Sequence, residues 1–403
     1  MCPTPPTSNL SSNFQNNRDL FSGSDLSDET HQSIKPDGLP GSAASLLIDN
    51  FSTRASQLQD HAVDIARLGL SNHFASQVES VEINTIHPRP NSRVLDCDLH
   101  LANGQRHRVM IKIYEPIGAG TQTNLEKLIS DDFGITTRLH QHFHSNPRFQ
   151  VPIPLFHSPQ DRLIVTLHMP GMQLQEKLVG QAGWFPSQTT VRDLELNCRS
   201  CGEWLRAFQT ATLDSISGGL DLERMRDMIA QRLQWLVDDP NMPIDEMQRD
   251  RILDHFDREV AALRPEDLAV SSIHGDFFPG NVLVDEDRVV GLDFAMCRIG
   301  STCADPSYFM FQLETLTYKP KFRRGVVSKL QRAFLQGYDP TIPAGNYFTS
   351  SPIVRIHFIL HNVMRLAGMT SRKGRAPWKR KLHNWGVAIA VTRRLLRIAR
   401  AHQ

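Results

Sequence analysis

The sequence predicts an α+β fold in two lobes, with a small antiparallel sheet in the amino-terminal lobe and a mostly helical carboxy-terminal lobe. Two observations lead to this prediction. Between residues 81 and 167, short apolar runs that alternate with polar residues are separated by turn residues, which is typical of strands. After Gly171, apolar residues recur mainly at helical spacing, and one β segment over residues 270–294 interrupts them.

Composition and length set the outer bounds of this prediction. The 403 residues are 40% hydrophobic and 22% charged, which is ordinary for a globular protein with a sizeable core. We expect a disordered leader over residues 1–44, rich in Ser, Asn, Pro and Asp, a first lobe over 45–169 and a second over 170–403. The formal net charge of +1 argues against a nucleic-acid partner. We find neither a secretory signal nor an apolar run long enough to span a membrane, and therefore expect a cytoplasmic protein.

The first lobe is predicted to contain five strands and two helices. Asn103-Gly104 is a strong signal for a two-residue hairpin between two of the strands. Met169-Pro170-Gly171 then reads as a turn or hinge that ends the lobe. The expected helices are Ser52–Leu70 and Thr123–Phe143, and the expected strands are Val81–Ile86, Arg93–Leu101, Arg108–Tyr114, Ile153–Phe156 and Arg162–Leu167.

The second lobe is predicted to be a set of helices around one β segment. Its apolar residues follow a period of 3.6, with no internal repeat of 20 to 50 residues. The expected helices are Thr190–Thr212, Leu220–Val237, Ile244–Leu263 and Tyr308–Thr317, followed by several to the carboxy terminus.

The strongest chemical signal lies in the β segment, which reads SIHGDFFPGNVLVDEDRVVGLDF from Ser272. Two short apolar strands surround a turn that we place near Asp287. Antiparallel pairing would then set Asn281 opposite Asp293, with Asp276 on the loop that enters the same end. The pattern predicts a hairpin that brings an amide and two carboxylates together.

These residue types suit phosphoryl transfer. The reaction needs hard oxygen ligands that hold Mg²⁺ on the phosphates, for which Asn281 and Asp293 are the candidates. It also needs a carboxylate that orients the attacking hydroxyl and accepts its proton, for which Asp276 is the candidate. Turn geometry alone explains each of these residues singly but not their joint pattern. His274 is more typical of a structural loop histidine, and we assign it no chemistry.

The segment HGDFFPGNVLV and the later LDF resemble the aminoglycoside phosphotransferase and choline kinase-like family. The resemblance extends in general order over about residues 75–340, and it is specific only in the central motif. It implies a two-lobed protein-kinase-like fold with ATP in a cleft, whose adenine meets the backbone of a hinge; the matching residues are Leu167, His168 and Met169. It also implies a small hydroxyl-bearing acceptor.

A lysine stands inside the apolar strand RVMIKIY. Lys112 is either an edge lysine that reaches solvent or, as the family pattern implies, a ligand of the ATP phosphates. Such a lysine is usually fixed by a carboxylate on the next helix, commonly a glutamate. Helical geometry places Asp132 in the middle of the apolar stripe of that helix and Glu126 well to its side. We therefore predict that Asp132 pairs with Lys112, because a buried carboxylate needs a partner.

Two further features concern the phosphates and a helix start. The expected loop between the first two strands, His87–Ser92, has no glycine, unlike the G-x-G-x-x-G loop of a protein kinase. Asp305-Pro306 is good helix-start chemistry, with Asp at the N-cap, and we interpret it as structural.

The cysteines, two histidines and the basic carboxy-terminal region give weaker indications of function. Six cysteines in a chain of this length are expected to be free thiols, and the pair Cys198 and Cys201 lacks further zinc ligands at suitable spacing. His357 and His361 are spaced like metal ligands, but without a third ligand we expect them to pack between helices. Residues 340–403 contain no Asp or Glu and many Lys and Arg. The last helix is predicted to be amphipathic, with an apolar face that includes Trp385, Ala388 and Leu395 and with Arg393 and Arg397 off that face. This basic region is either a solvated surface or a site for an anionic membrane, nucleic acid or anionic substrate.

The function that combines these features is an ATP- and Mg²⁺-dependent phosphotransferase acting on a hydroxyl of a small molecule or glycan. The alternative is a catalytically weak pseudokinase that serves as a binding or scaffold module. Intact Lys112, Asp276, Asn281 and Asp293 argue against it, and the glycine-free loop argues for it. A protein kinase is a further alternative, disfavoured by that loop and by HGD in place of HRD.

Overall fold

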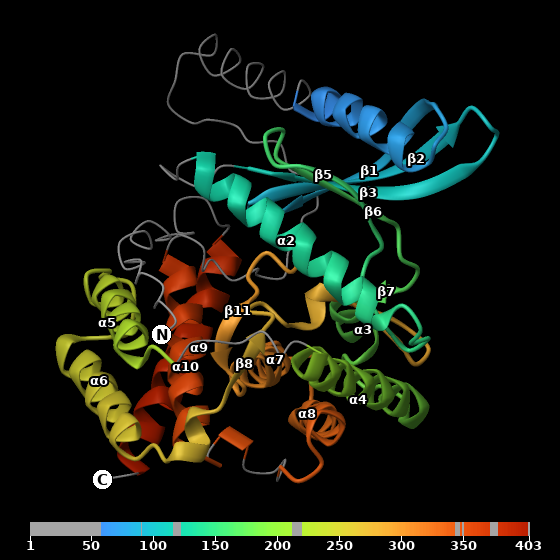
Figure 1. Ribbon diagram of the computed structural model, residues 1–403. Helices are drawn as coiled ribbons and strands as arrows, with labels where there is room; N and C mark the ends of the chain where they lie inside the picture. The colour runs from blue at the N-terminus through green and yellow to red at the C-terminus, as the bar shows by residue number, and fades with distance from the viewer. Residues whose placement is uncertain are drawn as a thin grey trace, which may run out of the picture. The chain divides into compact units, whose positions relative to one another are not determined.

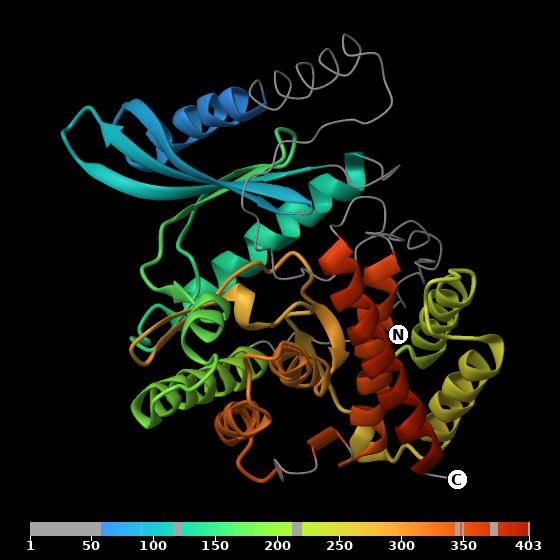
Figure 2. The ribbon, with the colours of Figure 1, turned by 180° about the vertical axis from the view of Figure 1, so that it is seen from behind.

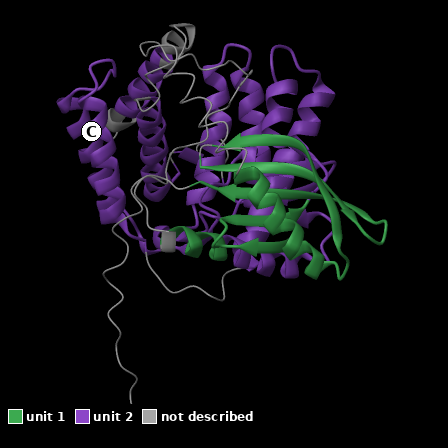
Figure 3. Ribbon diagram, turned by 90° about the horizontal axis from the view of Figure 1, so that it is seen from above, with its two compact units in different colours: residues 1–131, 155–167 green, residues 132–154, 168–403 purple. Residues whose placement is uncertain are grey.

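The computed structural model describes residues 58–89, 91–115, 122–211, 220–342, 347–348, 350–370 and 378–401. The predicted leader over residues 1–44 lies outside them. The chain divides into two compact units, residues 1–131 with 155–167 and residues 132–154 with 168–403 (Figure 3). The first carries an antiparallel sheet and the second is mostly helical, so the predicted α+β class is confirmed.

The first unit is built on a five-stranded sheet with the order β1-β2-β3-β6-β5, in which β1, β2, β3 and β6 pair antiparallel. The five predicted strands all exist, although the first is longer than expected. Their bounds are β1 Val78–Arg89, β2 Ser92–Leu101, β3 Arg106–Tyr114, β5 Pro154–Ser158 and β6 Leu163–Leu167.

The core of this unit lies between the sheet and a helix over residues 58–73, which is drawn in blue along the sheet in Figure 1. In β3, Val109, Ile111 and Ile113 alternate with more exposed residues and are fully buried. This period of two places every second side chain on the face that the helix covers. Ala62 and Ala66 of the helix are buried against that face, and their small size lets the backbone approach closely.

The hairpin between β2 and β3 differs from the predicted two-residue turn. Leu101 N–H donates to Gln105 O at 3.0 Å, so three residues lie between the paired positions. Gly104 adopts φ +82°, and its N–H donates to Leu101 O at 2.8 Å. A three-residue loop with glycine in the left-handed region is the next most common hairpin connection. The signal therefore located the turn but not its length.

The second unit contains most of the helices. The four predicted helices are present, and the last of them begins four residues earlier than expected. The bounds in order are α3 Leu174–Gln181, α4 Gln188–Ala211, α5 Leu222–Val237, α6 Glu246–Ala261, α7 Ala304–Thr315, α8 Arg324–Tyr338, α9 Pro352–Thr370 and α10 Trp378–Ala401. The helix α2, Gln122–Phe143, spans the division between the units.

Two small sheets complete this unit. One has the order β4-β10-β9-β7, and the other pairs β8 with β11 antiparallel. Figures 1 and 2 show the β8–β11 pair beside α9 and α7. The bounds are β4 Phe149–Gln150, β7 Met172–Gln173, β8 Val270–Ile273, β9 Val282–Asp285, β10 Arg288–Gly291 and β11 Arg298–Ser301.

An aromatic cluster joins the helices to the β segment. Trp204 of α4 is fully buried and stacks on Phe277, with ring centroids 5.3 Å apart, and on Phe208 at 5.6 Å. Its indole N–H donates to Gln150 O at 3.0 Å, so the one polar atom of the ring is satisfied. A side chain on Gly291 would place its Cβ 2.2 Å from the Trp204 ring. Trp204 therefore requires glycine at the end of β10.

A second core lies among α5, α6, α9 and α10. Ala388 and Leu395 of α10 are buried, whereas Arg393 and Arg397 are exposed, which confirms the predicted amphipathic pattern. Trp385 is the exception: we expected it on the apolar face, and it is 53% exposed. Among the described residues, no helix is long and apolar enough to cross a membrane.

Candidate active site

The loop after β8 places Asp276 beside Asn281. The amide nitrogen of Asn281 donates to Asp276 Oδ2 at 2.9 Å and to Asp276 O at 3.0 Å. Pro279–Asn281 forms a short 3₁₀ turn closed by Asn281 N–H donating to Phe278 O at 2.9 Å. Because its nitrogen serves Asp276, the amide of Asn281 has its oxygen left as the atom suited to a metal.

His274 holds this loop from inside. It is fully buried, and its Nε2–H donates to Leu292 O at 2.9 Å. Asp276 N–H donates to its Nδ1 at 3.4 Å. Burial lowers the pKa of His274, so the ring is neutral, and one tautomer serves both bonds. This arrangement agrees with the structural role that the sequence suggested.

Asp305 binds the same loop, and the sequence had suggested a different role for it. Its Oδ2 accepts from His274 N–H at 2.7 Å and its Oδ1 from Gly275 N–H at 2.9 Å. We had expected Asp305 to be a helix N-cap, but α7 begins at Ala304 with Cys303 as its N-cap. That prediction is wrong because a buried acceptor for a distant loop has the same local sequence as a cap. Burial raises the pKa of Asp305, and the hydrogen bonds from the His274 and Gly275 amides oppose this effect.

Gly275 is required between these contacts. It adopts φ +81°, and a Cβ there would lie 2.4 Å from Met296 O. Both the backbone conformation and the close approach of another chain segment exclude a side chain. Close packing at Gly275 thus fixes the backbone that leads into Asp276.

The hairpin has a register one residue away from the predicted one. Val282 pairs with Gly291 and Asp285 with Arg288, so Asn281 lies opposite Leu292, not Asp293. Leu292 N–H donates to Asn281 O at 2.9 Å. The prediction placed the centre of the turn half a residue too late.

Asp293 leaves the hairpin in an unusual conformation. Its φ is +65°, in the left-handed region, and the residue is exposed. Asp293 raises the pKa of Asp276, after the larger effect of burial, and the two together bring that pKa to about 8. The two carboxylates are therefore close enough to repel each other, which a cation between them would relieve.

Asp132 supports the residue after Asp293. It is 4% exposed, and its Oδ1 accepts from Phe294 N–H at 3.1 Å. The helical wheel had placed Asp132 on the buried stripe of α2, and its burial confirms this. Glu126 is half-buried. No sequence pattern indicated the bond to Phe294, which joins residues 162 positions apart.

Lys112 and the hinge residues are the other predicted contacts for ATP. In the sheet, Lys112 pairs with Val94 on one side and Ile164 on the other, so it is not on an edge strand. Its Nζ lies 4.5 Å from the centroid of the Tyr114 ring. The two compact units divide between Leu167 and His168. The proposed pairing of Lys112 with Asp132 stays a prediction.

The expected phosphate loop is largely strand. His87 pairs with Val94 and Arg89 with Ser92, so only residues 90 and 91 connect β1 to β2. The prediction of a loop over His87–Ser92 is therefore wrong in its extent. Pro88 does not prevent the pairing, because β1 lies at the edge of the sheet, where a missing N–H is tolerated.

The other candidates lie in packing environments. Cys198 and Cys201 are fully buried on α4, and burial raises the pKa of both thiols. His357 and His361 stack with ring centroids 5.9 Å apart, and burial lowers the pKa of both. Arg394 of the basic carboxy-terminal region pairs with Glu314 and lies over the Phe358 ring at 4.5 Å. That arginine takes part in helix packing.

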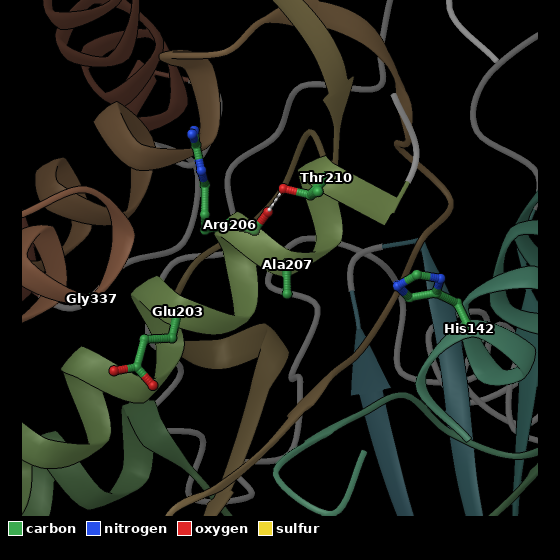
Figure 4. A pocket seen from close by; sticks show the side chains of 6 residues that line it. All are labelled: His142, Glu203, Arg206, Ala207, Thr210 and Gly337. Atoms are coloured by element: carbon green, nitrogen blue, oxygen red, sulfur yellow. Dashed lines mark hydrogen bonds between the residues drawn. The ribbon is translucent and has the colours of Figure 1, made fainter. Parts of the chain in front are cut away.

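A surface pocket lies elsewhere in the second unit (Figure 4). Glu203, Arg206, Ala207 and Thr210 line it from α4, opposite His142 of α2 and Gly337 of α8. None of the predicted site residues belongs to it. The candidate active site is therefore the loop and hairpin of residues 274–293, and this pocket shares no residue with it.

The comparisons with known proteins agree with the family resemblance and with the fold. Residues 133–344 match the model of the phosphotransferase enzyme family, which covers more than half of the chain. A thermostable mutant of the aminoglycoside phosphotransferase APH(4)-Ia, solved with AMP-PNP and hygromycin B, has a TM-score of 0.53 at 15% identity over 84% of this chain and 99% of that one. The amicoumacin kinase hAmiN, solved with AMP-PNP, Ca²⁺ and Ami, has a TM-score of 0.50 at 13% identity over 77% and 88%. A search of curated proteins found no match. The matched segment contains Asp276, Asn281 and Asp293, and the chain belongs to the phosphotransferase enzyme family.

Proposed function

We propose that the chain transfers the γ-phosphoryl group of ATP to a hydroxyl of a small molecule or glycan, with Mg²⁺ as the metal. The observation that carries the proposal is the bond from Asn281 to Asp276, next to the exposed carboxylate of Asp293. This set offers one carboxylate for the acceptor and two oxygen donors for the metal. Structural neighbours solved with ATP analogues and antibiotics support a nucleotide and a small acceptor.

Asp276 is the proposed base. In the transfer, the bond from the γ-phosphorus to the ADP oxygen breaks, a bond to the acceptor oxygen forms, and the hydroxyl proton passes to Asp276 Oδ. The Asn281 amide donates to Asp276 Oδ2 and so fixes the orientation of the carboxylate. Asp305 and His274 accept hydrogen bonds from the backbone of residues 274–276, so the proposed base is positioned before the acceptor arrives.

The donor set fits a divalent cation. Asn281 and Asp293 supply hard oxygen atoms, which Mg²⁺ and Ca²⁺ prefer. Burial, and then the charge of Asp293, raises the pKa of Asp276, and a bound cation would offset both effects. Such a metal supplies neutralisation of the phosphate charge. Lys112 is the proposed additional cation for the phosphates, with Asp132 as its partner, and the backbone of Leu167, His168 and Met169 is the proposed adenine contact.

The test is ADP formation by the full chain with ATP, a Mg²⁺ titration and a panel of hydroxyl compounds. We expect acceptor-dependent ADP release that requires the metal. Asn281→Ala and Asp293→Ala should each raise the Mg²⁺ concentration for half-maximal nucleotide binding by roughly tenfold or more, because one oxygen ligand is lost. Asp285→Asn on the same hairpin is the matched control, because this exposed carboxylate pairs only with Arg288 among the contacts described for it. Binding of ATP without any turnover would favour the pseudokinase alternative.

A further inference from the structure

The register of the first unit's sheet places His87 on the face that carries Lys112. His87 of β1 pairs with Val94 of β2, and Val94 pairs with Lys112 of β3; Figure 1 shows these three strands side by side. Residues that pair directly across an antiparallel sheet point to the same face. Successive residues of one strand point to opposite faces, so side chains two positions away from this row lie on its face as well.

Arg89 belongs to the next row on this face. It pairs with Ser92 of β2, which pairs with Tyr114 of β3. Arg89 thus lies two strands from Lys112, about 10 Å across the sheet, and two residues along it, about 7 Å. Both side chains are long, so their cationic groups can reach the same extended anion.

The helix over residues 58–73 covers the opposite face of these strands. Val109, Ile111 and Ile113 alternate with Lys112 along β3, and they are fully buried in the cluster that includes this helix. Lys112 and Arg89 therefore lie on the face that points away from the helix. Arg89 is exposed, and among the described residues it has no salt-bridge partner.

Arg93, the other arginine at this turn, has a different environment. It pairs with Ile113, so it points to the helix side of the sheet, and its Nε donates to Glu115 at 2.6 Å. Glu115 N–H donates to Asn91 O at 3.0 Å. These contacts tie the turn to the end of β3. Of the two arginines, Arg89 is the one that shares the face of the proposed phosphate lysine.

The sequence of the turn disfavours phosphate binding through the backbone. A glycine-rich loop holds phosphates with N–H groups that no side chain obstructs. Here Pro88 and Pro90 have no N–H, and the connection contains no glycine. A guanidinium supplies five N–H donors and binds a phosphate through two parallel hydrogen bonds. An arginine between two prolines therefore offers from its side chain the donors that the backbone lacks.

We propose that Arg89 binds the polyphosphate chain of the nucleotide beside Lys112, and that its side chain takes the place of the glycine-rich loop. The inference rests on the proposed function and adds a residue that recognises the phosphates of its nucleotide. It also gives the glycine-free turn, which had favoured a pseudokinase, a way to bind ATP. The contribution of Arg89 should therefore depend on the phosphates and not on the adenine.

The test compares a ligand that contains adenine with one that lacks it. Binding of Mg-ATP and of magnesium tripolyphosphate to the full chain is measured by calorimetry. We expect Arg89→Gln to weaken both by roughly ten- to a hundredfold, the usual range for a hydrogen bond to a charged group. Arg89→Lys should recover part of the loss, because an ammonium group keeps the charge but not the paired donors. Urea unfolding of Arg89→Gln should match that of the wild type, because the residue is exposed.

The matched control is Arg106→Gln. Arg106 begins β3, is exposed and stands six residues before Lys112, so it lies on the same face of the same sheet but about 20 Å away along the strand. It removes the same charge from the same surface. Both ligands should bind this variant as they bind the wild type.

Three outcomes would overturn the inference. The first is Mg-ATP binding in Arg89→Gln equal to that of the wild type. The second is an equal loss in Arg106→Gln, which would assign the effect to the net charge of the sheet. The third is a loss in Arg89→Gln for Mg-ATP but not for tripolyphosphate, which would move the contact away from the phosphates.

Failure of the proposed function gives a different result. A wild-type chain that does not bind Mg-ATP at all contradicts the proposed function and, with it, this inference. Wild-type binding that Lys112→Ala weakens and Arg89→Gln leaves unchanged contradicts the inference alone.

Discussion

The sheet of the first unit and the β9–β10 hairpin of the second, which carries the candidate active site, are both β structures, but different forces fix their geometry. In the sheet, β3 pairs with β2 over nine consecutive positions and buries alternate side chains. In the hairpin, only four pairs join β9 to β10. The residues that matter chemically lie beyond those pairs, on the loop before β9 and at Asp293 after β10.

Side chains from distant elements replace the backbone ladder around the hairpin. Asp305 accepts from two amides of the loop, and Asp132 accepts from the amide of Phe294. A ladder distributes its stabilisation over many equivalent bonds. Around the hairpin, one carboxylate group is the acceptor for one or two buried N–H groups, and its loss leaves them without an acceptor. Single substitutions should therefore disturb the catalytic segment far more than comparable ones disturb the sheet.

The largest effect is expected for Asp276, the proposed base. Asp276→Asn keeps the shape of the side chain and an acceptor oxygen, but it cannot take a proton. Turnover should fall by roughly two orders of magnitude or more, the usual contribution of a general base, with Mg-ATP binding retained. Single-turnover transfer and nucleotide calorimetry measure both quantities. Turnover close to that of the wild type would remove Asp276 from the mechanism.

The predicted pairing of Lys112 with Asp132 has the next largest expected effect. Breaking a buried ion pair costs about 3–5 kcal/mol when the site is dry and less when water reaches it. Asp132→Ala should reduce turnover at least as much as Lys112→Ala, because Asp132 also supports Phe294. The double variant should be little worse than either single one, as coupled residues behave in a double-mutant cycle.

Glu126→Ala is the control for that pairing. Glu126 lies on the same helix and is half-buried, whereas Asp132 is buried. Turnover should stay near the wild-type value. A large loss in this variant, together with additive losses for Lys112→Ala and Asp132→Ala, would assign the partner of Lys112 to Glu126.

Substitutions of Asp305 test directly how much the catalytic segment depends on one side-chain acceptor. Asp305→Ala leaves two buried N–H groups without their acceptor, at about 1–3 kcal/mol each. Removing a buried carboxylate whose pKa burial has raised returns part of that cost. We expect a net loss of about 2 kcal/mol in the free energy of unfolding, measured with urea, and a lower turnover. Asp305→Asn keeps one acceptor oxygen and should lie between, so equal stability of all three chains would contradict the role.

The sequence was sufficient where geometry follows from local pattern. Alternation predicted the five strands of the first unit, and the period of 3.6 placed Asp132 on the buried stripe of α2. The spacing of the HGD sequence and Asn281 predicted that Asp276 and Asn281 lie together, because only four residues stand between them. These are short-range consequences of chain stereochemistry.

The sequence was insufficient where partners are distant or where one residue decides a register. The turn of the hairpin could be centred only to within a residue, and that shift moved Asn281 from Asp293 to Leu292. Asp305 has the sequence context of a cap but binds amides 31 and 30 positions away. Tertiary packing selects between such alternatives, and nothing in the local pattern records it.

The smallest expected effect concerns a buried histidine on α9, where no ladder or loop is involved. Burial, and then Arg298, lowers the pKa of His357 from 6.5 to about 4. Between those values the unfolded chain binds a proton that the folded chain does not, so stability falls as the pH is lowered through this window. From pH 7 to pH 5 the loss from this one residue should be about 2 kcal/mol, at about 1.4 kcal/mol per pKa unit. Urea unfolding of the wild type and His357→Leu at both pH values measures it. The variant should lose less stability on acidification, because its replacement cannot be protonated; equal losses in the two chains would show that His357 is not neutral and buried in solution.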